Sequence, residues 1–262
     1  MKQGHSRWRK EDIIKMYYKG FITYNNKASN SFSDFKLIMT TPPEYIHSEI
    51  RHDTFVVPNR DGELYGENTY RGNTTIKVSF DIVTSGAVAN YTAALNALYM
   101  WLEGTGQLSI SDEAAYYEVK KVVITTDQRT IVNYGKIDVE FTVYPYKFKT
   151  MSPPYTDETS LTNTDYDTSM PMFLYTFADG VTSATISVNN KSMTIYKPTG
   201  SSIVFVDTRK QISYYQDNQD MNLYHNVRVA GDYRDLYFKR GNITITVSSG
   251  SVRTYPRWGW KI

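Results

Sequence analysis

FVVPNRDGELYG, residues 55–66, is the stretch around which the rest of the chain is organised. Its apolar start, Phe55-Val56-Val57, is typical of a strand, and Pro58 ends that strand because proline has no N–H for a sheet ladder. Asp61-Gly62 then supplies the positive backbone φ that a tight reversal needs. These residues predict a turn, although an ordinary surface loop would have the same pattern.

Length and composition favour a β-rich chain of two domains. The 262 residues are enough for two hydrophobic cores, or for one large all-β unit. Hydrophobic residues make up 40% and charged residues 21%, so the chain is neither wholly disordered nor membrane-spanning. Tyrosine occurs 23 times, and its ring suits both pleated sheets and wet interfaces between subunits.

The same composition excludes several kinds of site and partner. Without cysteine there are no disulfides and no thiolate metal ligands. A net charge of +2 does not predict specific nucleic-acid binding, which would need a basic patch. No apolar run approaches the length of a membrane span, and the polar start has no signal-peptide core, so no membrane partner is expected.

Residues 1–15 are interpreted as a translated leader. Lys10-Glu11-Asp12 can be encoded by a purine-rich stretch that resembles a ribosome-binding site, which favours Met16 as the true initiator. The basic run Arg7-Trp8-Arg9-Lys10 would also suit a nucleic-acid or membrane arm. We expect the leader to be disordered or a short frayed helix.

Two segments have the period of strands that are buried on one face. Apolar and polar residues alternate over 76–82 and again over 137–143. We expect these segments to pair in one sheet, and Pro145 to close the second.

Between them lies one convincing helix, at about 88–103. Its apolar residues are spaced three and four apart, and Gly104 is a good C-terminal stop. Burying each large residue of this stripe would contribute about 1.5–3 kcal/mol, so the stripe must meet a sheet. Trp101 and Met100 flank the stripe and are expected in the core or at a domain contact.

The last part of the chain favours a second, all-β domain. Residues 151–171 are rich in Pro, Thr and Asp without an apolar period, and they are predicted to be a linker. Residues 172–262 contain short strands at regular spacing, which indicates a sandwich.

Signs of catalysis are poor, and we expect no enzyme, cofactor or metal site. His5, His47, His52 and His225 are scattered, without the spacing of metal ligands. Asp61 and Glu63 are an alternative acid–base pair for the hydrolysis of cell-wall sugar, although turn formation explains Asp61 without catalysis.

A glycan-binding module is the second alternative. Trp258 and Trp260 could stack on sugar rings, or could pack the sandwich or a neighbour. His225-Asn226-Val227-Arg228 is a near miss to the galectin motif His-x-Asn-x-Arg, with the wrong spacing.

Several stretches resemble, in order, the distal tail proteins of siphophages, which join the tail tube to the tail tip. Residues 57–64, VPNRDGEL, are similar to the family's VPGRDGDL-like loop, with Asn59 where glycine is common. The other similar stretches are the start at 16–21, WLEG at 101–104, IDVEFTVYPY at 137–146, YRDLYFKRGNI at 233–243 and Pro-Arg-Trp at 256–258. Residues 233–243 resemble the family's aromatic-x-x-Leu-x-x-x-Gly-x-Asn segment. The departures are Asn59, the leader and a polar VSSG at 247–250 where an aromatic is often found.

The resemblance implies a mainly β fold and an assembly. Residues 16–150 would be an α+β ring-forming domain with one helix on β-sheets, followed at 172–262 by a galectin-like β-sandwich. Six copies would close head to tail into a homohexamer coaxial with the tail tube. The chain would be made in the host cytoplasm and placed at the distal end of the virion's tail, in a tailed phage or prophage of a Gram-positive host.

The resemblance also implies partners and a first site to test. The partners are the tail tube protein, a tail-associated lysin-like hub protein, and receptor-binding or other baseplate proteins. Arg60, Asp61 and Glu63 are candidates for the contact between subunits, because the loop displays them beside a rigid turn. The alternative reading is a glycan-binding β-sandwich of a phage tail that takes part in host adsorption, through Trp258 and Trp260.

Overall fold

The computed structural model describes residues 18–58, 61–85, 88–151, 154–164, 168–217 and 223–262. The chain divides into two compact units, Met1–Lys147 with Ile262, and Phe148–Lys261. Each unit has its own cluster of buried hydrophobic residues. The proposed leader lies outside the described residues.

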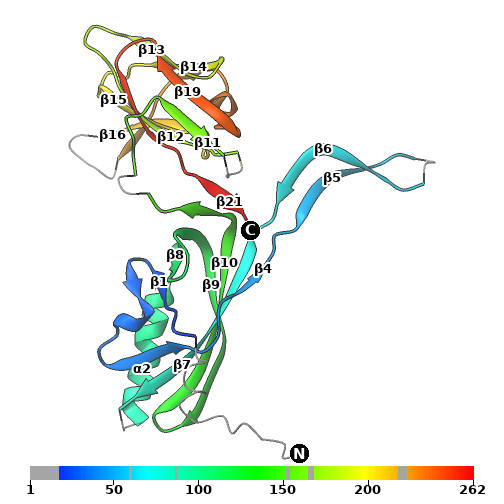
Figure 1. Ribbon diagram of the computed structural model, residues 1–262, viewed down its shortest axis with the longest axis vertical. Coiled ribbons are helices and arrows are strands. Elements are labelled where there is room, and N and C mark those ends of the chain that lie inside the picture. Colours follow the sequence, from blue (N-terminus) through cyan, green and yellow to red (C-terminus); the bar gives the residue numbers. More distant parts are fainter. Residues whose placement is uncertain (1–17, 59–60, 86–87, 152–153, 165–167, 218–222) are drawn as a thin grey trace, which may run out of the picture. The chain divides into compact units, whose positions relative to one another are not determined.

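In its described residues, the first unit consists of a large sheet, the helix α2 and a long hairpin (Figure 1). The path of the sheet is β2-β1-β8-β9-β10-β7-β3, and β4 also pairs with β7. The elements are β1 Ile22–Tyr24, β2 Lys27–Ala28, η1 Ser29–Ser31, β3 Phe35–Met39, β4 Glu44–Ile46, β5 Ile50–Val56, β6 Glu63–Arg71, β7 Thr74–Thr84, α2 Val88–Leu102, β8 Gly106–Ile110, β9 Ala115–Ile131 and β10 Tyr134–Lys149.

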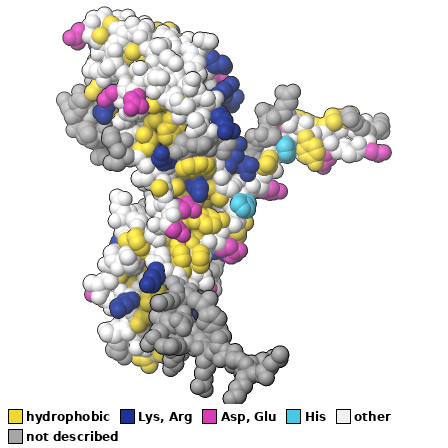
Figure 2. Space-filling view, in the orientation of Figure 1, with side chains coloured by type: hydrophobic (Ala, Val, Ile, Leu, Met, Phe, Trp, Pro, Cys, Tyr) yellow, Lys and Arg dark blue, Asp and Glu magenta, His cyan; other side chains and the backbone are white. Residues whose placement is uncertain are grey.

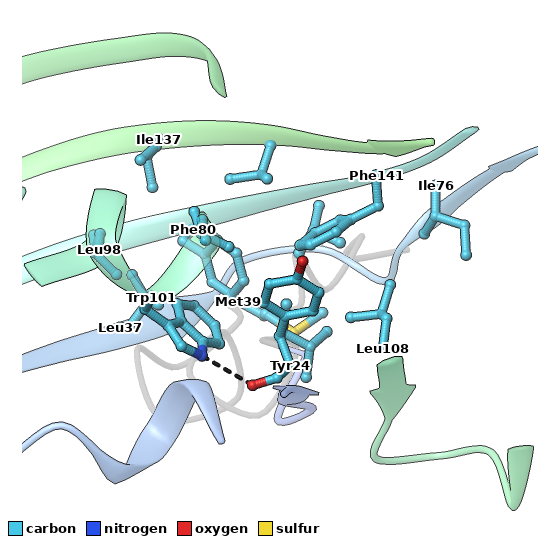
Figure 3. Packing of buried hydrophobic residues seen from close by; sticks show 14 of the residues in the cluster. Tyr24, Leu37, Met39, Ile76, Phe80, Leu98, Trp101, Leu108, Ile137 and Phe141 are labelled. Carbon is cyan, nitrogen blue, oxygen red and sulfur yellow. Dashed lines mark hydrogen bonds between the residues drawn. The ribbon is translucent and has the colours of Figure 1, made fainter. Parts of the chain in front are cut away.

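The two alternating segments pair as the sequence predicted. β7 and β10 are antiparallel, with Ile137 opposite Phe80 and Phe141 opposite Ile76. These four side chains are at most 1% exposed, because every second residue of each strand points to the same face. Figure 3 shows them packed in the core of the first unit.

Helix α2 covers this face, as its apolar stripe predicted. Tyr91, Leu98 and Leu102 are buried, and Gly104 follows the helix with φ +85°. Trp101 joins the core and its indole N–H donates a 3.2 Å hydrogen bond to the Tyr24 carbonyl oxygen (Figure 3). The helix is therefore tied to β1 as well as packed on the sheet.

The structure contradicts two expectations for this unit, a place in the core for Met100 and the end of a strand at Pro145. Met100 is not a core residue: its side chain is 77% exposed, because positions 98 and 102 face the sheet and position 100 points away from both. Pro145 does not close its strand, since β10 continues to Lys149. The register with β7 ends at Val143, so the N–H that Pro145 lacks is not needed by that ladder.

The second unit is a sandwich of two five-stranded sheets, β11-β19-β13-β14-β18 and β17-β16-β15-β12-β20. Both sheets contribute buried side chains to one core, which confirms the expected all-β sandwich. The elements are β11 Ser160–Asn163, β12 Met172–Thr176, β13 Ser183–Val188, β14 Lys191–Tyr196, β15 Ile203–Asp207, β16 Ile212–Gln216, β17 Tyr224–Asn226, β18 Val229–Ala230, η2 Tyr233–Leu236, β19 Gly241–Val247, β20 Ser251–Tyr255 and β21 Gly259–Lys261.

The stretch 151–171, which was predicted to be a linker, contributes to the sandwich through its described residues. It contains β11, which pairs with β19, and an isolated bridge joins Thr156 to Thr254 of β20. The segment therefore crosses from the edge of one sheet to the edge of the other. The polar composition did not predict this role, because backbone hydrogen bonds hold much of the segment and only isolated apolar residues, Met151 and Leu161, pack on the core.

Candidate assembly site

The stretch 55–66 lies in a two-stranded hairpin, the arm, which consists of β5, β6 and their connection. The arm is inserted between β4 and β7, two strands that pair with each other in the main sheet. β5 and β6 form a sheet of their own that extends away from the first unit's sheet (Figure 1). The arm is thus a continuation of one ladder beyond the core.

The end of the arm is the turn that the sequence predicted. β5 ends at Val56, which is paired with Glu63, and Gly62 has φ +82°. Open space surrounds the position of a Gly62 Cβ, so backbone conformation rather than crowding favours glycine there. Asn59 and Arg60 lie outside the described residues.

The base of the arm is fixed by hydrogen bonds. Arg71 Nη1 donates to the carbonyl oxygen of Ser48 at 3.3 Å and to Ser48 Oγ at 3.1 Å. Ser48 Oγ in turn donates to the carbonyl oxygen of Ile262 at 2.8 Å. The Gly72 N–H donates to the Glu49 carbonyl oxygen at 3.3 Å, which continues the ladder across the base.

Both faces of the arm display apolar side chains to solvent. Phe55 is opposite Leu64 on one face, and Val56 lies on the other face with Tyr65. Phe55 is 59%, Val56 75% and Tyr65 70% exposed. An isolated two-stranded hairpin is marginally stable in water, and exposed apolar patches mark places where proteins associate. Figure 2 shows hydrophobic side chains along the outer part of the arm.

The structure brings together part of the site proposed from sequence. Asp61 and Glu63 are both exposed at the end of the arm, while Arg60 is not described. The apolar residues Phe55, Val56 and Tyr65 also belong to this surface, and the sequence did not predict them there. An apolar run that ends at a Pro and an Asp-Gly turn is typical of a buried strand. The tertiary structure was needed to show that no other strand in the described part of the chain covers these residues.

The residues of the glycan alternative are mostly engaged within the second unit. Trp258 is 8% exposed and its ring centroid lies 5.8 Å from that of Phe238. Trp260 is half-buried in β21. His225 stacks on Tyr215 at 4.8 Å, and its Nε2 lies 3.3 Å from Asp217 Oδ2. The buried ring of Trp258 offers little area for stacking on a sugar.

The Pro-Arg-Trp segment has a structural role of its own. Arg257 binds Asp207 through two hydrogen bonds, Nη1 to Oδ1 at 2.7 Å and Nη2 to Oδ2 at 3.0 Å. Both side chains are buried, with 10% and 3% exposed. Burial raises the pKa of the Asp207 carboxyl, but the hydrogen bonds and charge of Arg257 outweigh it, so the net pKa lies below its ordinary value.

Neither metal ligation nor membrane insertion is indicated within the described residues. No three His, Cys, Asp or Glu side chains among them gather closely enough to hold a metal ion. In the same residues, no helix has the length and hydrophobicity that crossing a bilayer requires.

The fold of the chain is similar to that of proteins in two solved phage structures. The chain is similar to the SPP1 phage protein Dit (gp 19.1), with 13% sequence identity, a TM-score of 0.63, and coverage of 93% of this chain and 99% of that one. Dit is described as a paradigm of the hub adsorption apparatus in phages that infect Gram-positive bacteria.

A chain of the phage P2 baseplate, in its activated conformation with Ca, has a similar fold. The identity is 8% and the TM-score 0.54, with 93% of this chain and 98% of that one covered. The sequence itself matches no protein-family model and no curated protein. The resemblance to distal tail proteins, inferred from short motifs, is thus confirmed at the level of the fold.

Proposed function

We propose that the chain is a distal tail protein, a structural component of the tail tip of a phage or prophage that infects Gram-positive bacteria. In this role six copies form a hub ring that joins the tail tube to the baseplate and catalyses no reaction. The observation that carries the proposal is the likeness to Dit over nearly the whole of both chains. Such a match includes both units and their order along the chain, rather than one common domain.

The arm supports a ring in particular. A head-to-tail contact joins two different surfaces, and such contacts close into a ring when their rotation allows it. The arm has one apolar surface on each face and is anchored at its base by Arg71, so it is suited to reach another copy. Asp61, Glu63 and Arg60 would lie at the rim of that contact, where charges set orientation more than affinity.

The partners in this proposal are divided between the two units. The ring of first units would meet the tail tube protein and a tail-associated lysin-like hub protein along the axis. The sandwich of the second unit, which we propose to be galectin-like, would attach receptor-binding or other baseplate proteins. The chain would therefore act in host adsorption as a connector at the distal end of the tail in the virion.

Electron microscopy tests the proposal directly. Class averages of the purified full chain are expected to show rings with sixfold symmetry, and native tail tips with a labelled copy are expected to place the label around the axis. A native particle in which the chain lies off the axis, or occurs as a solitary copy, contradicts the proposal.

A further inference from the structure

A cavity in the second unit is not used by the proposed ring. It has a volume of about 560 Å³ and lies where the chain crosses from the edge of one sheet to the other. We refer to it as the crossing cavity, and its chemically distinctive lining residues are Lys149, Tyr155, Asp157, Glu158, Arg253 and Trp258. The volume is within the range of roughly 300–1,000 Å³ that is typical of small-molecule sites.

Backbone pairing places the polar and aromatic side chains of this cavity. Thr156 and Thr254 form a bridge with two hydrogen bonds of 2.7 and 2.8 Å. In an antiparallel bridge the residues on either side are also opposite each other, so Asp157 comes to lie beside Arg253. Asp157 Oδ1 is 3.1 Å from Arg253 Nε, and the guanidinium lies 5.9 Å from the ring centroid of Tyr155.

The contact between Asp157 and Arg253 uses only part of each side chain. It joins Arg253 Nε to Asp157 Oδ1, and the other carboxylate oxygen of Asp157 takes no part in it. The Glu158 N–H is held by Thr156 Oγ1 at 3.1 Å, while its side chain is exposed. A planar carboxylate and a planar guanidinium can each engage two neighbouring hydroxyl groups of one ligand.

The charges of the lining favour a neutral ligand. Two carboxylates, Asp157 and Glu158, are balanced by two cations, Lys149 and Arg253. An anion or a cation would meet one like-charged pair, whereas a polyhydroxyl compound can donate to the carboxylates and accept from the cations. Tyr155 adds an apolar surface on which the C–H face of a sugar ring can pack.

From these features we infer that the crossing cavity binds a short neutral saccharide. Asp157, Glu158 and Arg253 bind its hydroxyl groups, and Tyr155 contacts its apolar face. This site differs from a glycan site on Trp258 and Trp260, since the ring of Trp258 is largely in the core. The inference does not depend on the proposed ring, because every lining residue belongs to the second unit.

The test uses the full chain and a glycan array of defined mono- to tetrasaccharides from bacterial cell walls, with calorimetry on each saccharide that binds. We expect saturable binding that the double variant Asp157→Asn, Glu158→Gln weakens by about tenfold or more. Asp179→Asn, which removes an exposed carboxylate outside the cavity, is the matched control and leaves the affinity unchanged. Arg253→Met is expected to weaken binding as well.

Thermal unfolding separates binding from folding, since the exposed Asp157–Arg253 pair contributes little to stability. The inference fails if no saccharide on the array binds, or if binding is the same in the double variant. A different result would assign the cavity to a protein partner. In that case no saccharide binds, an oligo-arginine peptide does bind, and the double variant abolishes binding of the peptide. Ring formation, counted on the same samples, is unaffected by any of these outcomes.

Discussion

β7 and the arm strand β5 belong to the same unit and are both rich in apolar residues, but their surroundings differ. Alternate residues of β7 are buried from Thr74 to Thr84. The strand pairs with β10 on one side and with β3 on the other. In β5 no residue is buried, and Phe55 and Val56 are more than half exposed. The chain itself covers the apolar face of β7, whereas it leaves the apolar side chains of β5 exposed, and exposed apolar patches mark places where proteins associate.

This difference in exposure predicts different effects of substitutions in the two strands. Substitutions in β7 should act on folding of the single chain, and substitutions in the arm should act on contacts between chains. A buried position should therefore lose more free energy of unfolding on substitution than a similar exposed position.

The largest effect is expected for Phe80→Ala in the middle of β7. Phe80 is 1% exposed, so the change leaves a cavity and should lower the free energy of unfolding by about 3–5 kcal/mol. Phe55→Ala on the arm removes the same side chain from a 59% exposed position and should cost less than about 1 kcal/mol. Denaturant unfolding measures both, and equal losses would show that the arm is covered within the single chain.

The second effect extends the comparison to charged residues. Arg257→Met leaves the buried Asp207 without its partner and should cost about 3 kcal/mol in chemical denaturation. Arg51→Met breaks the exposed Arg51–Glu49 pair near the base of the arm, 3.6 Å long, and should cost at most about 1 kcal/mol. A small loss in Arg257→Met would mean that water reaches Asp207.

The pH dependence of stability should report the same buried pair. The pKa of Asp207 is lower in the folded chain than its ordinary value of 3.8. At pH values between these two pKa values, the unfolded chain therefore binds more protons than the folded chain. Stability from this group is therefore complete above about pH 4 and is lost as the pH falls through the folded pKa. Asp207→Asn should flatten the acid limb of a plot of unfolding free energy against pH, and an unchanged slope contradicts this assignment.

The smallest effect on stability is expected from the arm itself. The double variant Val56→Ser, Tyr65→Ser should change the free energy of unfolding by only about 0.5 kcal/mol, because both side chains are more than two-thirds exposed. The same variant should abolish rings in electron micrographs. Ile203→Ser, at a 43% exposed position in the second unit, is the control that should keep the rings. Rings that persist without Val56 and Tyr65 would remove the arm from the proposed contact.

Much of the fold could be predicted from local patterns. The period of two in residues 76–82 and 137–143, and the three-and-four spacing in the helix, depend only on which face a residue occupies. The Asp-Gly turn was predictable for a similar reason, since positive φ at Gly62 is a property of one residue. In each case the determining interaction lies within a few positions along the chain.

Local patterns did not predict which distant segments of the chain pair with each other. The role of 151–171 depends on Thr254 and β19, which lie about ninety residues further on, and its own residues have no apolar period. The crossing cavity likewise combines Asp157 with Arg253 through one bridge. Neither pairing can be predicted from the local composition of the two segments that pair.

The sequence by itself determined the class of the fold, the helix, the turn at Gly62 and the resemblance to distal tail proteins, because these follow from the order and spacing of residue types. Only the tertiary structure decided that Phe55 and Val56 are exposed while Trp258 is buried. The physical reason is that burial is a property of neighbours in space. The same apolar run becomes core or contact surface according to whether its own chain supplies a covering sheet.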